Sequence, residues 1–177
     1  MTRSTNATRK PKLWDEMLPF AFNFLREKYD IIGTPAIYIS QYLNTCLAEI
    51  GTNEITDNDG NKKYVFEIIV SNRLLKYYSF EEQLAVIYHE LVHYAMMIQG
   101  KEYRDGTPEF EKELKKHNIL SAESLPLRGK VHKWECNCDQ FRPIQMHYPV
   151  KKLPGNLTKC PLCNEKMKYI GTDIIEK

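Results

Sequence analysis

The sequence predicts an α+β fold in which helices pack on a small sheet, followed by a small metal-binding module. Three observations support this prediction. Residues 79–100 carry apolar side chains at helical spacing, with no glycine or proline before position 100. Residues 64–70, Y-V-F-E-I-I-V, are rich in β-branched and aromatic side chains, which is typical of a strand. Two close pairs of cysteines follow near the end of the chain.

Length and composition limit the classes of protein to which this chain can belong. The 177 residues, 42% of them apolar, suffice for one domain of ordinary size or for one domain plus a small module. No run of about 18 apolar residues occurs, and the basic N-terminus lacks the apolar stretch of a secretory signal. We therefore expect a cytoplasmic protein (host cytoplasm if the chain is viral), whose five cysteines are metal ligands or free thiols rather than disulfides.

Charge is distributed unevenly along the chain. Residues 1–125 hold 15 basic and 18 acidic residues, a net charge of −3, whereas residues 126–177 hold 10 and 5, a net charge of +5. A basic C-terminal part indicates an acidic partner such as DNA. The alternative is a solvated, lysine-rich surface.

The first half of the chain predicts a basic arm, a helix and three strands. Residues 1–12 have four basic residues and no acid, which predicts a disordered arm. Residues 13–29 predict an amphipathic helix whose start is limited by Pro19. Strands are expected at 37–40 and 45–50, where Cys46 is interpreted as a buried small apolar residue. A turn at 56–63 leads to the 64–70 strand, whose exposed edge could pair with an extended peptide.

The 79–100 helix has clear start and stop signals and carries the motif H-E-L-V-H. Ser79 followed by Glu82 forms a capping box, and Gly100 is a helix stop. His89 and His93 lie four residues apart, so both imidazoles can reach one metal ion from the same helix face. Glu90 can contact a water on that metal without being a ligand, which is the arrangement of zinc peptidases. The alternative is two ordinary polar histidines on a half-buried helix.

Two histidines leave a catalytic zinc one protein ligand short. Asp105 is the first candidate, because it lies in an Asp-Gly turn just before a second helix, which Thr107 caps and Pro108 begins. Glu109 and His117 are the other candidates. The alternative interpretation is that Asp105 forms the turn and does not bind a metal.

The C-terminal part predicts a zinc ribbon over residues 132–172, joined by a linker at residues 121–131. Cys136 and Cys138 form one pair, and Cys160 and Cys163 form the second in a C-P-L-C knuckle. Four such thiolates typically hold a structural zinc. Neither His132 nor His147 is needed as a ligand. Basic and aromatic side chains suited to nucleic acid surround the module: Lys130, Lys133, Phe141, Arg142, Tyr148, Lys151, Lys152 and Lys159.

Three features together resemble the SprT-like metalloproteases, a superfamily that includes the eukaryotic Spartan proteases. They are the H-E-L-V-H-Y helix, a G-K-x-Y segment followed by a short x-x-F-x-x-x-L helix, and a C-x-C…C-x-x-C ribbon. The resemblance covers residues from about 14 to 172. It implies a zincin-like peptidase domain over residues 13–120, with zinc on His89 and His93 and with Glu90 as general base. It also implies cleavage of proteins that are bound or crosslinked to DNA.

One position departs from the family pattern. Members commonly place a third histidine just before the short helix, and Asp105 stands in the nearest equivalent place. A carboxylate brings more negative charge to a zinc and makes its water less acidic. Two further functions therefore stay open: a non-catalytic zinc-binding module that docks DNA or protein through the ribbon, and a zinc peptidase with no link to nucleic acid.

Overall fold

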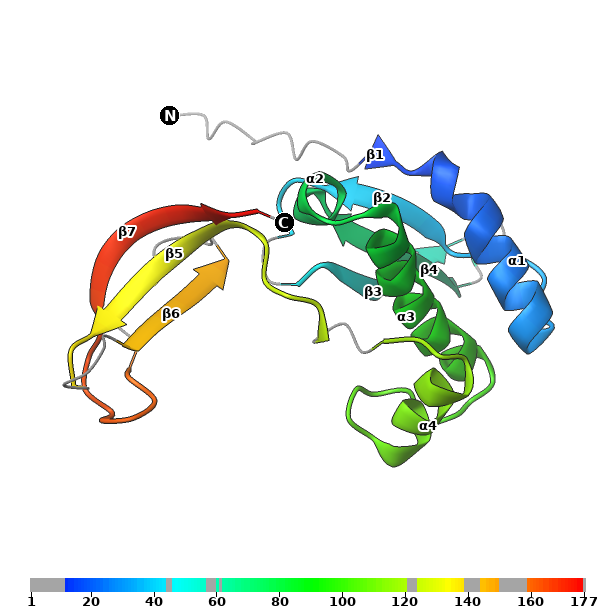
Figure 1. The fold of residues 1–177 in the computed structure, drawn as a ribbon. Coiled ribbons are helices and arrows are strands. Elements are labelled where there is room, and N and C mark those ends of the chain that lie inside the picture. The colour runs from blue at the N-terminus through cyan, green and yellow to red at the C-terminus, as the bar shows by residue number, and fades with distance from the viewer. Residues whose placement is uncertain are drawn as a thin grey trace.

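The structure, a computed structural model, describes residues 12–43, 46–56, 60, 62–120, 124–138, 144–149 and 159–176. Within these ranges the fold is mixed α+β, as predicted, and contains two sheets (Figure 1). A four-stranded sheet with the order β1-β2-β4-β3 packs with helices to form the N-terminal body. A three-stranded sheet with the order β6-β5-β7 forms the C-terminal sheet. None of the helices in the described ranges has the length and apolar character that crossing a membrane requires.

The chain enters the body through a short strand and not through the helix predicted from residue 13. Strand β1 (Lys12–Leu13) pairs antiparallel with β2, a 3-10 turn covers Asp15–Met17, and α1 spans Leu18–Tyr29. The predicted helix start is wrong because Pro19 lacks an N–H and is accommodated in the first turn of α1. Of the predicted basic arm, residues 1–11 lie outside the described ranges, and Lys12 belongs to β1.

The sheet of the body is built around β4 (Lys62–Ser71). Strand β2 (Ala36–Ser40) runs parallel to β4, and β3 (Ala48–Thr56) runs antiparallel to it on the other side. The strands predicted at 37–40 and 64–70 are confirmed. The strand predicted at 45–50 starts later, at Ala48, and continues to Thr56. The open edge was expected on β4, but β4 is paired on both sides, and β1 and β3 are the edge strands. Of the predicted turn, residues 57–59 and 61 lie outside the described ranges.

The central helix α3 (Phe80–Ile98) follows the sequence prediction closely. The Ser79 N–H donates to Glu82 Oε2 (2.7 Å), and the Glu82 N–H donates to Ser79 Oγ (3.3 Å), which completes the capping box. The helix ends before Gly100, whose φ of +65° suits a glycine. A short helix that was not predicted, α2 (Asn72–Tyr77), links β4 to α3.

The second predicted helix is present as α4 (Pro108–Lys116). Thr107 occupies the position before it, but its hydroxyl donates to the Arg104 carbonyl (2.7 Å) and does not cap the helix. Phe110 and Leu114 turn into the core, where α1, α3, α4 and one face of the sheet meet. The largest fully buried side chains of this core are Met17, Leu25, Ile37, Ile68, Val70, Leu74, Val86, Ile87, Leu91, Phe110 and Leu114.

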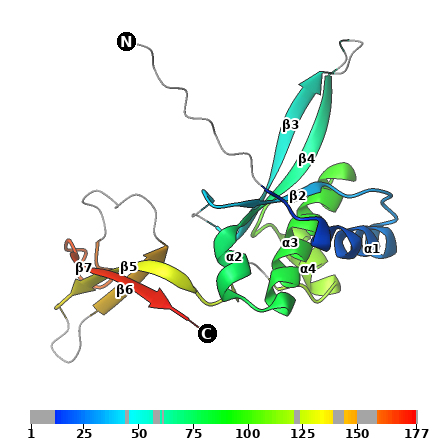
Figure 2. The same cartoon turned by 90° about the horizontal axis from the view of Figure 1, so that it is seen from above.

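The C-terminal sheet consists of β5 (Gly129–Cys136), β6 (Ile144–Pro149) and β7 (Lys168–Ile175). Strand β5 begins inside the segment predicted as a linker, and β7 continues beyond residue 172. The sheet stands to one side of the body, and the start of β5 runs beside α2 (Figures 1 and 2). In the body, the far part of the β3–β4 hairpin extends away from the helices (Figure 2).

Candidate metal centres

Helix α3 presents His89 and His93 on one face, one turn apart. Both side chains are buried, with relative exposures of 3% and 9%. Their Nε2 atoms lie 3.1 Å apart. Two nitrogen atoms with lone pairs this close are favourable only when a proton or a cation lies between them. The helix therefore brings together two ligands of a candidate metal site.

Asp105 completes this group from the turn between α3 and α4. Its Oδ1 lies 3.1 Å from His89 Nε2 and 3.4 Å from His93 Nε2. A tetrahedral zinc with bonds of about 2.0–2.1 Å has ligand–ligand edges of about 3.3–3.4 Å, so the three donor atoms fit such an ion. Unlike the histidines, the Asp105 side chain is 69% exposed.

The two other candidate ligands are not part of this cluster of donors. His117 Nε2 lies 3.0 Å from Glu113 Oε1, and its ring packs beside Phe24 and Tyr29 on α1. Glu109 lies on α4, and its side chain is exposed. Asp105 is thus the carboxylate that the structure brings to the histidines.

Groups around the histidines set their orientation and protonation. His93 Nδ1 contacts the Tyr103 carbonyl and donates to it, which leaves Nε2 free to act as a ligand. The Phe110 ring stacks on His93 at 4.0 Å and meets His89 edge-on at 5.3 Å. His89 Nδ1 is buried and has no hydrogen-bond partner in the described part of the chain. Burial, above all, lowers the pKa of both imidazoles and favours the neutral form that binds metal.

Glu90 is a buried carboxyl that faces the same cleft. Burial, followed by the negative charges of Asp105 and Glu49, raises its pKa to about 8. A hydrogen bond from the Ile50 backbone acts in the opposite direction and favours the carboxylate. A bound cation beside His89 would favour the carboxylate as well. Glu90 is therefore held between edge strand β3 and the donor cluster.

The cleft has a volume of about 500 Å³ and joins the cluster to the edge strand. Some of the residues that line this cleft were not identified from the sequence. Glu49 and Ile50 come from β3, and Cys46, which was given no role, also lines it. The Tyr103 carbonyl was missed as well, because a backbone oxygen leaves no side-chain signature in a sequence. The lining residues are Cys46, Ala48, Glu49, Ile50, Glu90, His93, Tyr103, Arg104 and Asp105.

The four C-terminal cysteines meet at the end of β5 and in the knuckle before β7. Their sulfur atoms lie within 4.8 Å of one another, and the pairs Cys136–Cys163 and Cys138–Cys160 are each 3.6 Å apart. Zinc–sulfur bonds of about 2.3 Å in a tetrahedron give edges of about 3.8 Å, so the group fits a zinc ion.

Backbone geometry in the knuckle favours a thiolate. Hydrogen bonds from the backbone of Cys163 and then Leu162 lower the pKa of Cys160 to about 7. The neighbouring Cys160 sulfur raises the pKa of Cys138 to about 12. Thiolates crowded in this way repel one another unless a cation lies among them.

Other residues predicted near this module have different surroundings. The His132 ring is buried, and its Nδ1 lies 3.2 Å from the Tyr169 hydroxyl, away from the sulfur cluster. Lys133 Nζ lies 3.2 Å from Asp173 Oδ2 on the neighbouring strand. Lys130 and Lys159 are exposed. The side chains of Phe141, Arg142, His147, Tyr148, Lys151 and Lys152 lie outside the described part of the chain.

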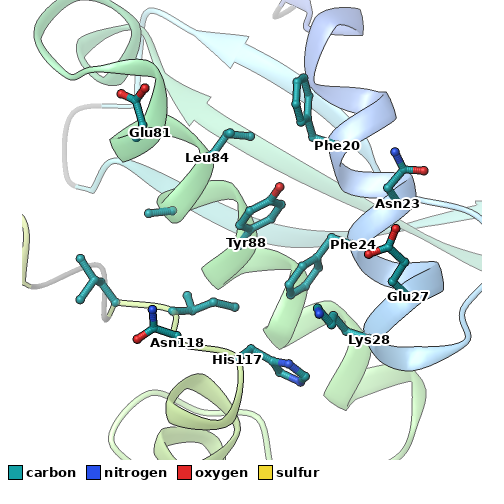
Figure 3. A pocket seen from close by; sticks show the side chains of 13 residues that line it. Phe20, Asn23, Phe24, Glu27, Lys28, Glu81, Leu84, Tyr88, His117 and Asn118 are labelled. Atoms are coloured by element: carbon teal, nitrogen blue, oxygen red, sulfur yellow. The ribbon is translucent and has the colours of Figure 1, made fainter.

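A second cavity of about 710 Å³ lies between α1, α3 and the chain that follows α4 (Figure 3). Phe24 and Tyr88 stack at 4.6 Å on its floor, and Glu27 and Lys28 lie at its rim. His89, His93 and Asp105 do not line it. The cavity is therefore separate from the candidate metal site.

The curated proteins that resemble this chain include two with the name Protein SprT-like. No protein-family profile matches the chain. "Protein SprT-like" of Oceanobacillus iheyensis is 29% identical over 133 residues, covering 73% of this chain and 81% of that protein. "Protein SprT-like" of Anoxybacillus flavithermus is 28% identical over 106 residues, covering 58% of this chain and 68% of that protein. Both metal-ligand groups could bind an ion and are consistent with zinc. Together, the relatives support the assignment of this chain to the SprT-like family.

Proposed function

We propose that the chain is a zinc-dependent peptidase with a zincin-like body. The observation that carries this proposal is the position of Glu90. Its buried carboxyl lies on α3 beside His89 and faces a cleft that also contains His93 and Asp105. A buried acid next to a three-donor metal group is the minimum that metal-assisted peptide hydrolysis requires. The SprT-like name of the relatives supports the same class of enzyme.

Each residue of the group has a defined task in this proposal. His89, His93 and Asp105 would hold the zinc, which when bound polarises a peptide carbonyl and lowers the pKa of a water molecule. Glu90 accepts the proton of the attacking water and passes it to the leaving amine. The Ile50 backbone fixes the Glu90 carboxyl, and burial keeps bulk water from competing for its proton.

The edge strand supports a protein substrate in extended form. Strand β3 is open on the side that faces the cleft, so a peptide could add to the sheet beside Glu90. We further propose that the substrates are proteins bound or crosslinked to DNA. Support comes from the net positive charge of residues 126–177 and from the exposed Lys130 and Lys159 on the C-terminal module.

The four-cysteine group is assigned a structural zinc. Among the described residues of the C-terminal sheet, the buried apolar cluster is small and consists of Trp134, Cys160 and Met167, with Cys136 packed against it. So little apolar contact holds a fold only with additional links, and a metal ion provides four.

Substitution of the proposed base tests the proposal. We expect Glu90→Gln to keep its zinc and to lose protein hydrolysis by at least about 100-fold, because a carboxamide cannot take up the proton. Zinc content and cleavage of a DNA-crosslinked protein would be measured together. Glu109→Gln, on the exposed side of α4, is the matched control. Cleavage by Glu90→Gln at the wild-type rate would rule out this mechanism.

A second candidate function is a non-catalytic zinc-binding module. Asp105 favours it, because the residue is an exposed carboxylate where the resembled family commonly has histidine. Wild-type protein that binds two zinc ions but cleaves neither a DNA-bound nor a free unfolded protein would establish this function in place of hydrolysis.

A further inference from the structure

The Arg128 side chain connects the segment that leads into β5 with the start of α3 through polar contacts. Its Nη1 donates to Glu82 Oε2 (2.6 Å) and to the Tyr77 carbonyl (3.4 Å). The guanidinium also lies over the Tyr78 ring, 5.1 Å from its centroid. The Arg128 and Glu82 side chains are only 17% and 23% exposed, so water screens this pair less than a surface pair.

Tyr78 adds a second attachment to the same segment. Its hydroxyl accepts the Arg128 backbone N–H (3.1 Å) and donates to the Pro126 carbonyl (2.9 Å). Two backbone groups, one on each side of Leu127, are thus bound by one side chain of the body. The position of β5 relative to α3 is therefore set by specific polar contacts.

The attachment point is also the N-terminal cap of the helix that carries the metal motif. Glu82 Oε2 accepts the Ser79 N–H of the capping box and the Arg128 guanidinium at the same time. A change at the joint therefore reaches the first turn of α3 directly. The segment leading into β5 and the helix that carries the candidate metal site therefore share the Glu82 carboxylate.

A second arginine at the joint opposes this attachment. Arg73 Nε and Nη1 are buried, and neither finds an acceptor in the part of the chain that the structure describes. Gly129, the first residue of β5, lies against this side chain. A Cβ at position 129 would come within 3.0 Å of Arg73 Cγ and of Tyr77 Cδ2. Burying guanidinium donors without partners costs free energy, and this cost falls if the opening of the joint lets water reach Arg73.

We propose that this joint is a latch with a closed and an open position. In the closed position, Arg128 binds Glu82 and Tyr78 and holds the C-terminal sheet against the body. Arg73, whose stem lies against Gly129 and whose buried Nε and Nη1 have no partner in the described part of the chain, favours the open position. A ligand that binds the sheet more tightly in the open position would release Arg128 from the cap of α3. The latch would thus couple the C-terminal sheet to the metal helix.

Rotational diffusion of the two parts of the full-length, zinc-loaded protein tests the latch. In wild type, 15N relaxation of amides in α3 and in β5–β7 should give one common correlation time. In Arg128→Ala, the correlation time of β5–β7 should become shorter than that of α3, and exchange of the Glu82 amide should become faster. Lys133→Ala is the control, since Lys133 pairs with Asp173 within the sheet. Independent tumbling in wild type, or common tumbling in Arg128→Ala, would overturn the proposal.

Two further variants test the latch independently of Arg128→Ala alone. Tyr78→Phe removes only the hydroxyl and should loosen the sheet in the same sense, even if Arg128→Ala fails to fold. Arg73→Met removes the unpaired donors but keeps the stem beside Gly129. It should raise the unfolding temperature and restore common tumbling in the Arg128→Ala background. A lower unfolding temperature in Arg73→Met would show that Arg73 stabilises the closed position and would refute the latch as stated.

Discussion

At the scale of single residues, the three donors of the helix site are held with unequal strength. His93 is fixed on two sides, by the Tyr103 carbonyl and by the Phe110 ring. His89 is buried beside it. Asp105 lies in a turn, and most of its side chain is in solvent. The carboxylate is therefore the least constrained of the three donors.

We expect Asp105→Asn to weaken zinc binding at the helix site without affecting the cysteine site. The amide keeps the size of the side chain but removes its charge, and the affinity should fall by more than about tenfold. Zinc retained against a competing chelator would be counted, with two ions per chain expected for wild type and one for the variant. His89→Ala should give the same count. Two tightly held ions in both variants would exclude the site.

At the scale of secondary-structure elements, sequence signals identified those elements whose ends are determined locally. Helix α3 has a capping box, an uninterrupted apolar stripe and a glycine stop, and the structure shows all three. The start of β3 was misplaced, because it depends on pairing between Ala48 and Val70, which are far apart in the chain. Helix α2 has only 6 residues, too few to show a helical period. Asp105 was the first candidate from its position before the second helix, but the separation of Glu109 and His117 from the cluster depends on the path of a loop, which no local pattern predicts.

The carboxylate of Glu82, which the capping box of α3 shares with Arg128, should make the stability of the folded protein depend on pH. The hydrogen bond from Arg128, above all, lowers the pKa of Glu82 in the folded protein. Its contribution is therefore fully present above the ordinary carboxyl pKa and is lost as the pH falls through the lowered folded value. At neutral pH, Glu82→Gln should be less stable than wild type by about 1 kcal/mol. The difference should shrink in urea titrations at progressively lower pH, and a constant difference would contradict the ion pair.

Edge strand β3 offers a test of how the proposed peptide substrate would bind. The Ile50 N–H points away from β4 toward Glu90, so the Thr52 N–H, two residues on, faces the same open side. Thr52→Pro should fold normally but lower kcat/KM for an extended peptide by up to about tenfold, because one backbone hydrogen bond is lost. Asn53→Pro, whose N–H faces β4, should instead lower the unfolding temperature. Unchanged peptide cleavage by Thr52→Pro would rule out pairing at this position.

At the scale of the whole molecule, the net positive charge and the proposed catalytic group lie in different parts of the chain. The acidic body contains the cleft, whereas the basic C-terminal part contains the cysteine group. An acidic polymer would thus be attracted to the part of the molecule that does not contain Glu90. This separation makes DNA binding testable without disturbing the proposed catalytic group.

Replacing the exposed Lys130, Lys159 and Lys168 by alanine should reduce the salt dependence of DNA binding. Each lost phosphate contact lowers the slope of log K against log salt concentration by about 0.9. Fluorescence anisotropy at several salt concentrations measures this slope, and Lys12→Ala, Lys28→Ala and Lys101→Ala in the body are the matched controls. A slope equal to that of wild type would place the phosphate contacts elsewhere.

The whole helix site comes from a short stretch of chain, with His89, Glu90, His93 and Asp105 all preceding the first cysteine pair. Synthesis proceeds from the N-terminus, and domains generally fold in that order as they leave the ribosome. The body can therefore fold and bind a zinc ion before all four cysteines have left the ribosome. A nascent chain would expose the proposed hydrolytic group earlier than the part proposed to contact DNA, so a restraint on premature cleavage would at that stage have to come from the body.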